Sequence, residues 1–192
     1  MPRAGLTPDR VVVEAERIAD EVGLAALTLA AVATSLGVRQ PSLYKHITSL
    51  DGLRRSIAIR AKAELAEVLG NAAVGKSRDG ALRAVCSGYR AWALEHPGRY
   101  TAAVRAPEPD DIDDVAASTA AMEVVFRVLA GYDLEGDDAI DATRAIRASL
   151  HGFVTLETTG GFGLPRSASR SFDSLVEGLV VALETNSYRG SR

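Results

Sequence analysis

The chain has 192 residues, of which 47% are hydrophobic and 24% are charged. This length allows one or two domains with a sizeable core, and this balance is typical of a folded globular protein rather than a disordered one. No stretch approaches the roughly 20 apolar residues of a membrane span, and the first residues lack the apolar segment of a signal peptide. The single cysteine, Cys86, excludes an internal disulfide and a multi-cysteine metal site, so we expect a cytoplasmic protein.

The net charge of −3 is unevenly distributed along the chain. Residues 1–50 carry five Lys or Arg and five Asp or Glu, residues 51–76 carry five and three, and residues 77–192 carry twelve and seventeen. The acidity therefore lies in the C-terminal part. A neutral N-terminal part is compatible with a nucleic-acid partner but does not require one.

Helical periodicity dominates the chain, and strand signals are nearly absent. Thr7 as N-cap and Pro8 in the first turn predict a first helix that ends at Gly23. Thr28 predicts the start of a short second helix, and Gly37 predicts its end.

A third short helix is predicted in the stretch GVRQPSLYKHITS, residues 37–49, and Ser49 can cap a longer helix over residues 50–70. Further along the chain, Asp137 and Asp138 predict the start of a long helix, and Ser171 is predicted to cap the last helix. The expected C-terminal helices are one that ends at the His-Pro-Gly of residues 96–98, a short one over 100–106, and longer ones over 112–130, 138–158 and 171–186. The fold class is therefore all-α, with about nine helices.

Two short helices joined across Gly37 and Val38, with a third helix before them, fit a helix-turn-helix. At about 100° per residue, Leu43 and Ile47 fall on one side of the second short helix, where they would contact the core. Tyr44, Lys45 and His46 can donate to phosphates or to base edges, and Gln40 carries an amide that can bond adenine edges. The spacing alone fits a solvated helix surface as well.

The segment LTLAAVATSLGVRQPSLYKHITSLDGL, Leu27 to Leu53, resembles the DNA-binding segment of the tetracycline-repressor (TetR) family of bacterial transcription regulators. The shared features are the Thr-capped helix, the Gly-Val turn, Leu-Tyr-x-His and the Ser-capped helix that follows. In addition, AWALEHPGRY (residues 91–100) and LHGFVTLETTGGFGLP (residues 150–165) resemble the Trp/His-Gly type of regulatory domain in this family.

The resemblance implies a helix-turn-helix domain over residues 1–50 that binds double-stranded DNA. Gln40, Pro41, Ser42 and Lys45 would face the major groove, and Tyr44 and His46 would contact phosphates. Thr28 and Arg39 are two further candidates. The residues expected at the DNA are therefore Thr28, Arg39, Gln40, Pro41, Ser42, Tyr44, Lys45 and His46.

The sequence departs from the family's pattern at two places that often carry a basic residue. Leu50 stands before the acidic start of the fourth helix, and residues 29–31 of the second helix are Leu-Ala-Ala. We therefore expect a shallower dependence of DNA affinity on salt, with Arg39, Arg54 and Arg55 as candidates to compensate.

For residues 51–192 the resemblance implies a helical regulatory domain that binds a small-molecule effector and forms a homodimer through the last two long helices. The effector would shift the two DNA-binding modules through the helix over residues 50–70 and release the operator. Each candidate pocket residue is also a plausible core residue; the candidates are Tyr89, Trp92, Tyr100, Met122, Phe126, His151 and Thr155.

No cofactor or metal ion is expected, and the acidic stretch from Pro109 to Asp114 is interpreted as a solvated loop. An enzyme is not expected either, because the sequence lacks a Ser-His-Asp spacing, a phosphate-binding glycine loop and an HExxH motif. The alternative to a DNA-binding regulator is a helical protein-interaction module, or a small-molecule-binding protein without a DNA function.

Overall fold

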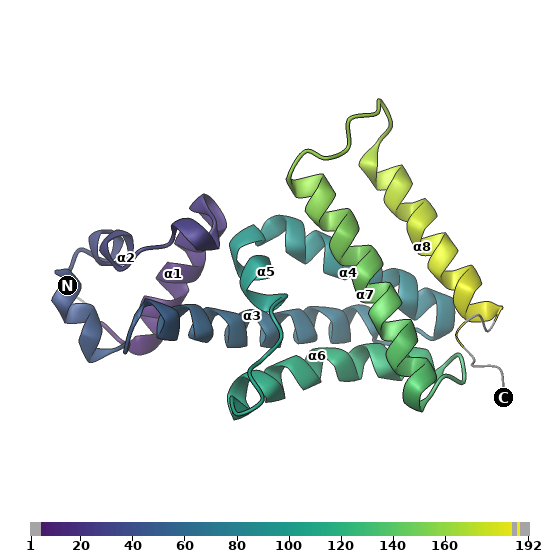
Figure 1. Ribbon diagram of the computed structural model, residues 1–192, viewed down its shortest axis with the longest axis horizontal. Helices are drawn as coiled ribbons and strands as arrows, with labels where there is room; N and C mark the ends of the chain where they lie inside the picture. The colour runs from purple at the N-terminus through teal and green to yellow at the C-terminus, as the bar shows by residue number, and fades with distance from the viewer. Residues whose placement is uncertain (1–4, 186–187, 189–192) are drawn as a thin grey trace. The chain divides into compact units, whose positions relative to one another are not determined.

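The computed structural model describes residues 5–185 and Tyr188. Within them it contains eight α-helices, two 3-10 helices and no strand, which confirms the predicted all-α class (Figure 1). The described residues form two compact units. The first unit runs to Glu64 and also includes Glu95–Ser118, and the second unit consists of Leu65–Leu94 together with the chain from Thr119 onward. The functional division after residue 50 stays a prediction.

The first unit begins with the elements that the sequence places in the DNA-binding part. They are α1 (Pro8–Val22), η1 (Leu24–Ala26), α2 (Leu29–Leu36), η2 (Gln40–Lys45) and the first part of α3 (Leu50–Ala73). Four predicted capping residues are confirmed by their hydrogen bonds. Thr7 accepts from the Arg10 amide and Thr28 from the Ala31 amide, Ser49 accepts from the Gly52 amide, and Gly37 ends α2 in the left-handed conformation at φ 67°.

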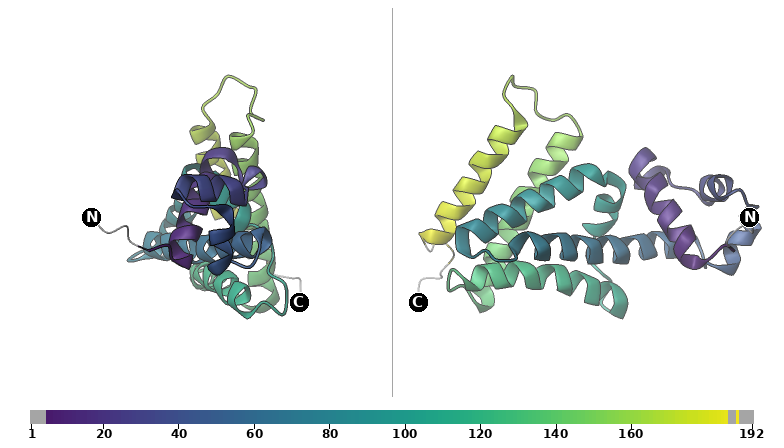
Figure 2. Two further views of the ribbon diagram at one scale, coloured as in Figure 1. Left: turned by 90° about the vertical axis from the view of Figure 1, so that its left-hand side faces the viewer. Right: turned by 180° about the vertical axis from the view of Figure 1, so that it is seen from behind.

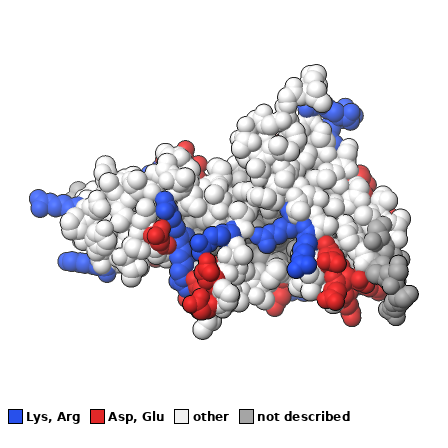
Figure 3. Space-filling view, viewed as in Figure 1, with Lys and Arg blue, Asp and Glu red and all other residues white. Residues whose placement is uncertain are grey.

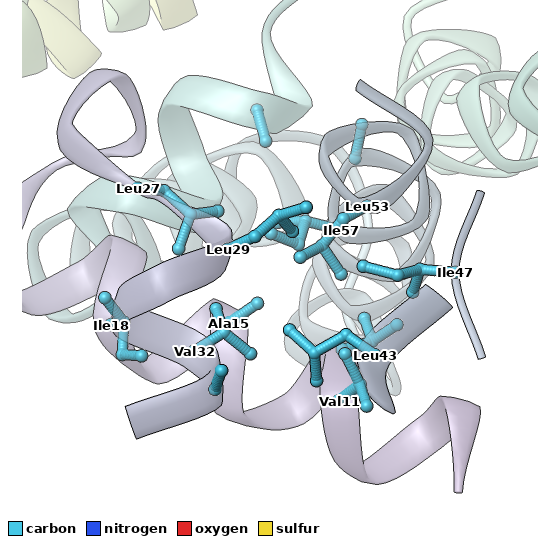
Figure 4. Close-up of a cluster of buried hydrophobic side chains, with 14 residues drawn as sticks. Val11, Ala15, Ile18, Leu27, Leu29, Val32, Leu43, Ile47, Leu53 and Ile57 are labelled. Carbon is cyan, nitrogen blue, oxygen red and sulfur yellow. The ribbon is translucent and has the colours of Figure 1, made fainter. Parts of the chain in front are cut away.

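These elements enclose an apolar core, shown in Figure 4. Val11 from α1, Val32 from α2, Leu43 from η2 and Ile57 from α3 each have 0% of their surface exposed. Leu43 and Ile47, predicted as the core contacts of the recognition segment, both lie in this cluster. Because four segments bury side chains against one another, the core fixes the orientation of η2 on α1 and α3.

The remaining helices are α4 (Arg78–Glu95), α5 (Pro97–Ala103), α6 (Ile112–Ala130), α7 (Gly136–Thr158) and α8 (Ala168–Glu184). In the second unit, α7 and α8 lie side by side, as Figure 2 shows from two directions. No helix of the described residues is both long and apolar enough to span a membrane.

Two helix starts differ from the prediction. Helix α5 begins at Pro97 rather than near residue 100, since proline is well tolerated in a first helical turn. The predicted cap of α8, Ser171, lies inside the helix, where its amide donates to the Ser167 carbonyl at 3.3 Å. Ser167 occupies the N-cap position instead, without a side-chain capping bond.

Candidate nucleic-acid interface

The recognition segment η2 is a 3-10 helix of six residues rather than an α-helix. The Ser42 amide donates to the Arg39 carbonyl and the His46 amide to the Leu43 carbonyl, both at 2.8 Å and both across three residues. The buried Leu43 anchors this turn to the core. The tight winding therefore spreads the neighbouring side chains around a single buried anchor.

The structure places the predicted DNA-contact residues at the surface around this anchor. Tyr44 is 54% exposed, although it follows the fully buried Leu43 directly. Ser42 and His46 are half-buried, and the other predicted contacts, Thr28, Arg39, Gln40, Pro41 and Lys45, are exposed. An exposed phenol beside a buried leucine is available to an external partner rather than to the core.

The segment that contains α2 and η2 carries charge of one sign in its own sequence. Between Val22 and Leu50 the sequence contains Arg39 and Lys45 but no Asp or Glu. The space-filling view shows basic and no acidic side chains over the end of the first unit that holds α2 and η2 (Figure 3). A surface without carboxylates can approach a phosphate backbone without like-charge repulsion, even though the chain as a whole is acidic.

Two of the three arginines proposed to compensate for Leu50 have carboxylate partners. Arg54 lies 3.3 Å from Asp51, and Arg55 contacts Asp111 at 2.5 Å and Asp113 at 3.0 Å. Arg39 has no ion pair among the described residues and is the candidate whose charge is free for DNA.

Helix α5 is held against the C-terminal end of α1 by a carboxylate. Asp20 Oδ1 accepts from the amides of Gly98 and Arg99 at 3.0 and 2.9 Å, and Asp20 Oδ2 accepts from Arg99 Nε at 2.7 Å. Arg99 Nη1 also donates to Glu64 of α3 at 2.7 Å. One arginine thus ties α1, α3 and α5 together within the first unit.

The start of α6 is held against α3 by a second ionic cluster. Lys62 Nζ donates to Asp114 Oδ1 at 2.5 Å, and both side chains are almost fully buried. Asp111 receives the Arg55 guanidinium, which holds the pKa of this carboxyl below its usual value. The interpretation of Pro109–Asp114 as a solvated loop is therefore wrong for these two aspartates, because they pair with cations of α3.

Burial shifts two other titratable groups. The pKa of Glu16 in α1 is raised because its carboxyl is buried, although Arg60 Nε donates to it at 2.9 Å and opposes the shift. Burial raises the pKa of the Cys86 thiol to about 12, which makes this cysteine a packing residue rather than a nucleophile.

Comparison with known proteins matches this chain to regulators of one family. The family model described as "Tetracyclin repressor-like, C-terminal domain" matches residues 82–179. The uncharacterized HTH-type transcriptional regulator Rv0681 of Mycobacterium tuberculosis is 40% identical over 158 residues, which cover 82% of this chain and 72% of that protein. The chain belongs to the tetracycline-repressor family.

Two further similarities extend this TetR-family assignment along the chain. The uncharacterized HTH-type transcriptional regulator YobS of Bacillus subtilis is 32% identical over 184 residues, 94% of this chain and 96% of that protein. The crystal structure of TetR-Q116A from Acinetobacter baumannii in complex with minocycline superposes with a TM-score of 0.72 at 22% identity, covering 97% and 100% of the two chains. Its low identity supports the fold alone, while the two relatives place this protein among transcriptional regulators.

The pocket residues predicted for this TetR-family member have diverse surroundings. Tyr89 and Trp92 are buried in the second unit, and Tyr100 is buried in the first. The others are less enclosed: Met122 is 39% exposed, Phe126 and His151 are half-buried, and Thr155 is exposed. Their role as effector contacts stays a prediction.

Sequence reasoning missed the residues that join the helices of the first unit. Helix α4 ends at Glu95, directly before the His-Pro-Gly of residues 96–98, as interpreted, but the close approach of Gly98 to the backbone of α1 was not foreseen. Asp20, Lys62 and Asp114 carried no local signal, because their partners lie 52 or more residues away. The acidic run before α6 was the one visible hint.

Proposed function

We propose that this protein is a cytoplasmic, ligand-responsive transcriptional repressor that binds a palindromic operator as a homodimer and leaves it when a small molecule binds the C-terminal part. The observation that carries the proposal is the surface of η2, where exposed Tyr44 and Lys45 flank a buried anchor in a segment without carboxylates. One short recognition element contacts only a few base pairs, so a second copy about one DNA turn away is needed for affinity.

The first test is specific binding to the DNA next to the protein's own gene. In a gel-shift titration, Lys45→Ala is expected to weaken the free energy of operator binding by about 1–3 kcal/mol if Lys45 reaches base edges. Tyr44→Phe removes one hydroxyl and costs about 0.5–1.5 kcal/mol. Comparing operator with random DNA separates the two roles. Tyr44→Phe is expected to weaken binding to both by the same factor, whereas Lys45→Ala is expected to weaken operator binding more and so to lower specificity.

Arg166→Ala is a control for the DNA test, since Arg166 is also an exposed cation but lies in the second unit. Its operator affinity is expected to equal that of the wild type. If the wild-type protein selects no genomic fragment over random sequence at about 0.1 M salt, where the Debye length is about 10 Å, the DNA-binding proposal fails. A helical protein-interaction module is then the remaining alternative.

Two glycines support a homodimer through α7 and α8. Gly152 and Gly178 lie inside these helices, where glycine is about 1 kcal/mol less favourable than alanine. A Cβ atom at either position would meet no other atom within 4 Å in the protomer, so packing inside one chain does not require glycine there. Close approach of a partner helix gives a reason for both residues.

The dimer prediction is tested with Gly152→Leu and Gly178→Leu. Each variant is expected to keep its helical circular dichroism, while the dimer dissociation constant measured by light scattering rises at least about tenfold. An overpacked contact costs about 1–3 kcal/mol, and a symmetric interface contains each change twice. Gly80→Leu, an exposed glycine of α4, is the matched control. An unchanged dimer in both variants would contradict this interface.

A further inference from the structure

A cleft in the second unit lies where the end of α3, the start of α4 and the end of α6 come together. Its volume is about 470 Å³, within the range of small-molecule sites. Three cations and three valines define its chemistry: Lys76, Arg78, Arg127, Val74, Val124 and Val128. Apart from Ser77, the other lining residues are glycine or alanine, so the walls offer positive charge and apolar surface.

The cations of this cleft lack carboxylate partners among the described residues. Lys76 Nζ donates to the Ala72 carbonyl at 2.9 Å, and Arg78 Nη1 donates to the Gly131 carbonyl at 2.9 Å. Arg127 has no hydrogen bond or ion pair in the described part of the chain. None of the residues that line the cleft is Asp or Glu.

This lack of partners sets the cations of the cleft apart from the other arginines of α4. On α4 itself, Arg83 pairs with Glu177 and Arg90 pairs with Glu157, each through two hydrogen bonds. The nearest carboxylate in sequence, Asp79, accepts from the Tyr132 hydroxyl at 2.8 Å. Positive charge that is compensated further along α4 thus has no carboxylate partner at the cleft among the described residues.

One of the cations is held in place before any ligand binds. The Arg78 guanidinium lies over the Tyr132 ring, 4.9 Å from its centroid, while it donates to the Gly131 carbonyl. An arginine that is already fixed by a ring and a carbonyl loses little side-chain freedom when an anion binds. Its guanidinium group also carries several donors in one plane, which suits a carboxylate or a phosphate.

We propose that this cleft binds a small organic anion, with its acidic head group at Lys76, Arg78 and Arg127 and an apolar chain along Val74, Val124 and Val128. Val74 is 70% exposed, so a ligand chain would cover apolar surface that the protein leaves open. The anion is either a carboxylate or a phosphate ester, since both accept hydrogen bonds from guanidinium and ammonium groups.

We further assign the effector of the proposed repressor to this chemical class, a step that rests on the proposed function. The cleft is lined by α3 and α6, and both helices have their other ends in the first unit. There, Lys62 of α3 pairs with Asp114 of α6, and Leu53 and Ile57 of α3 are part of the helix-turn-helix core. A ligand that changes the spacing of these two helices therefore acts on elements that carry η2.

The test uses calorimetry of the full chain with octanoate and hexyl phosphate as probes. Octanol has the apolar chain without the charge, and inorganic phosphate has the charge without the chain. At least one amphipathic anion is expected to bind once per chain, and both controls are expected to bind at least about tenfold more weakly. Which probe binds more tightly identifies the head group.

Lys76→Gln and Arg127→Gln are the informative variants, because both residues are exposed and make no ion pair in the described structure. Each is expected to weaken the affinity for the tighter-binding probe at least about tenfold. The stability, measured by the melting temperature, is expected to change no more than is usual for surface substitutions. Arg166→Gln makes the same charge change on an exposed residue outside the cleft and is expected to bind like the wild type. No binding of either anion, equal binding of octanol, or unchanged affinity in both variants would overturn the site.

The effector assignment has a separate readout. The better probe is expected to lower operator affinity of the wild type at least about fivefold, within the usual range of allosteric coupling, and to leave Arg127→Gln unaffected. A probe that binds in the cleft without changing operator affinity overturns the effector assignment and leaves the anion site standing. Operator binding measured without the probe tests the proposed function alone, so the two failures are distinguishable.

Discussion

Replacing Gly98 by alanine is expected to destabilise the first unit by about 3 kcal/mol or more, which is at the upper end for adding one methyl group. A Cβ atom at this position would lie 2.1 Å from both the carbonyl carbon and the carbonyl oxygen of Ala19, and 2.6 Å from the Asp20 amide nitrogen. These are backbone atoms of α1, so no side-chain rotation can relieve the clash. Helix α5 has to move away from α1.

That movement breaks more than a packing contact. The Gly98 amide donates to Asp20, and so do the amide and Nε of Arg99. Once α5 shifts, the Asp20 carboxylate loses three donors in a half-buried position, and a partly buried charge without donors is costly. The steric and polar losses therefore add in the same direction.

Urea denaturation followed by circular dichroism measures the effect, with Gly80→Ala as the matched control. Gly80 also lies in the first turn of a helix, and a Cβ atom there would be 4.0 Å from its nearest neighbour, a side-chain atom of Lys76. The control is expected to be neutral, or up to about 1 kcal/mol more stable than the wild type. Equal stability of Gly98→Ala and Gly80→Ala would show that α1 and α5 are not in close contact.

The sequence predicted the helix-turn-helix well because its signals are local. Thr28 caps α2 by bonding an amide three residues away, and the left-handed conformation at Gly37 satisfies the end of the same helix. Leu43 and Ile47 were found by their spacing alone. Capping and spacing depend on neighbours along the chain, so they are readable without a structure.

The winding of η2 was not predicted, although its position was. Six residues between Arg39 and His46 form too short a helix for periodicity to distinguish an α-helix from a 3-10 helix. The start of α8 was missed for a similar reason, since Ser167 and Ser171 are both acceptable caps and the helix begins after the first. Local rules do not distinguish such alternatives.

The contacts between helices, and the cationic cleft, cannot be predicted from local sequence patterns. Gly98 lies next to the backbone of Ala19 and donates a hydrogen bond to Asp20, which is 78 residues away in the sequence. Likewise, Lys76 and Arg127 are each unremarkable in sequence and line one cleft only because α3, α4 and α6 meet there. Distant pairs are specified by the fold, not by a spacing.

Removing Lys62 alone is expected to cost about 3–5 kcal/mol of stability, because Lys62→Met leaves the Asp114 carboxylate buried without its cation. The side chains of Lys62 and Asp114 are only 5% and 3% exposed, so water cannot replace the missing partner. The double variant Lys62→Met with Asp114→Leu removes both charges and keeps most of the volume. It is expected to recover most of the loss, since a buried ion pair and an apolar pair of similar size often differ little in stability.

A double-mutant cycle on urea midpoints isolates the coupling between the two residues. The exposed pair of Arg144 and Asp141, 3.5 Å apart with side chains 78% and 67% exposed, provides the comparison. The same cycle on that pair is expected to give no more than about 0.5 kcal/mol, because water and salt screen exposed charges. Additive effects of Lys62→Met and Asp114→Leu would contradict a buried pair.

If the coupling is large, the Lys62–Asp114 pair holds α3 and α6 together at this point of the first unit. The double variant then tests whether operator binding depends on the ion pair itself or only on the stability of the fold. An apolar pair keeps the helices packed but removes the directional bond that fixes their register. We therefore expect the double variant to fold with near wild-type stability and yet to bind the operator more weakly, because α3 also carries Leu53 and Ile57 of the core that orients η2. Wild-type operator affinity in this variant would mean that packing alone sets the register.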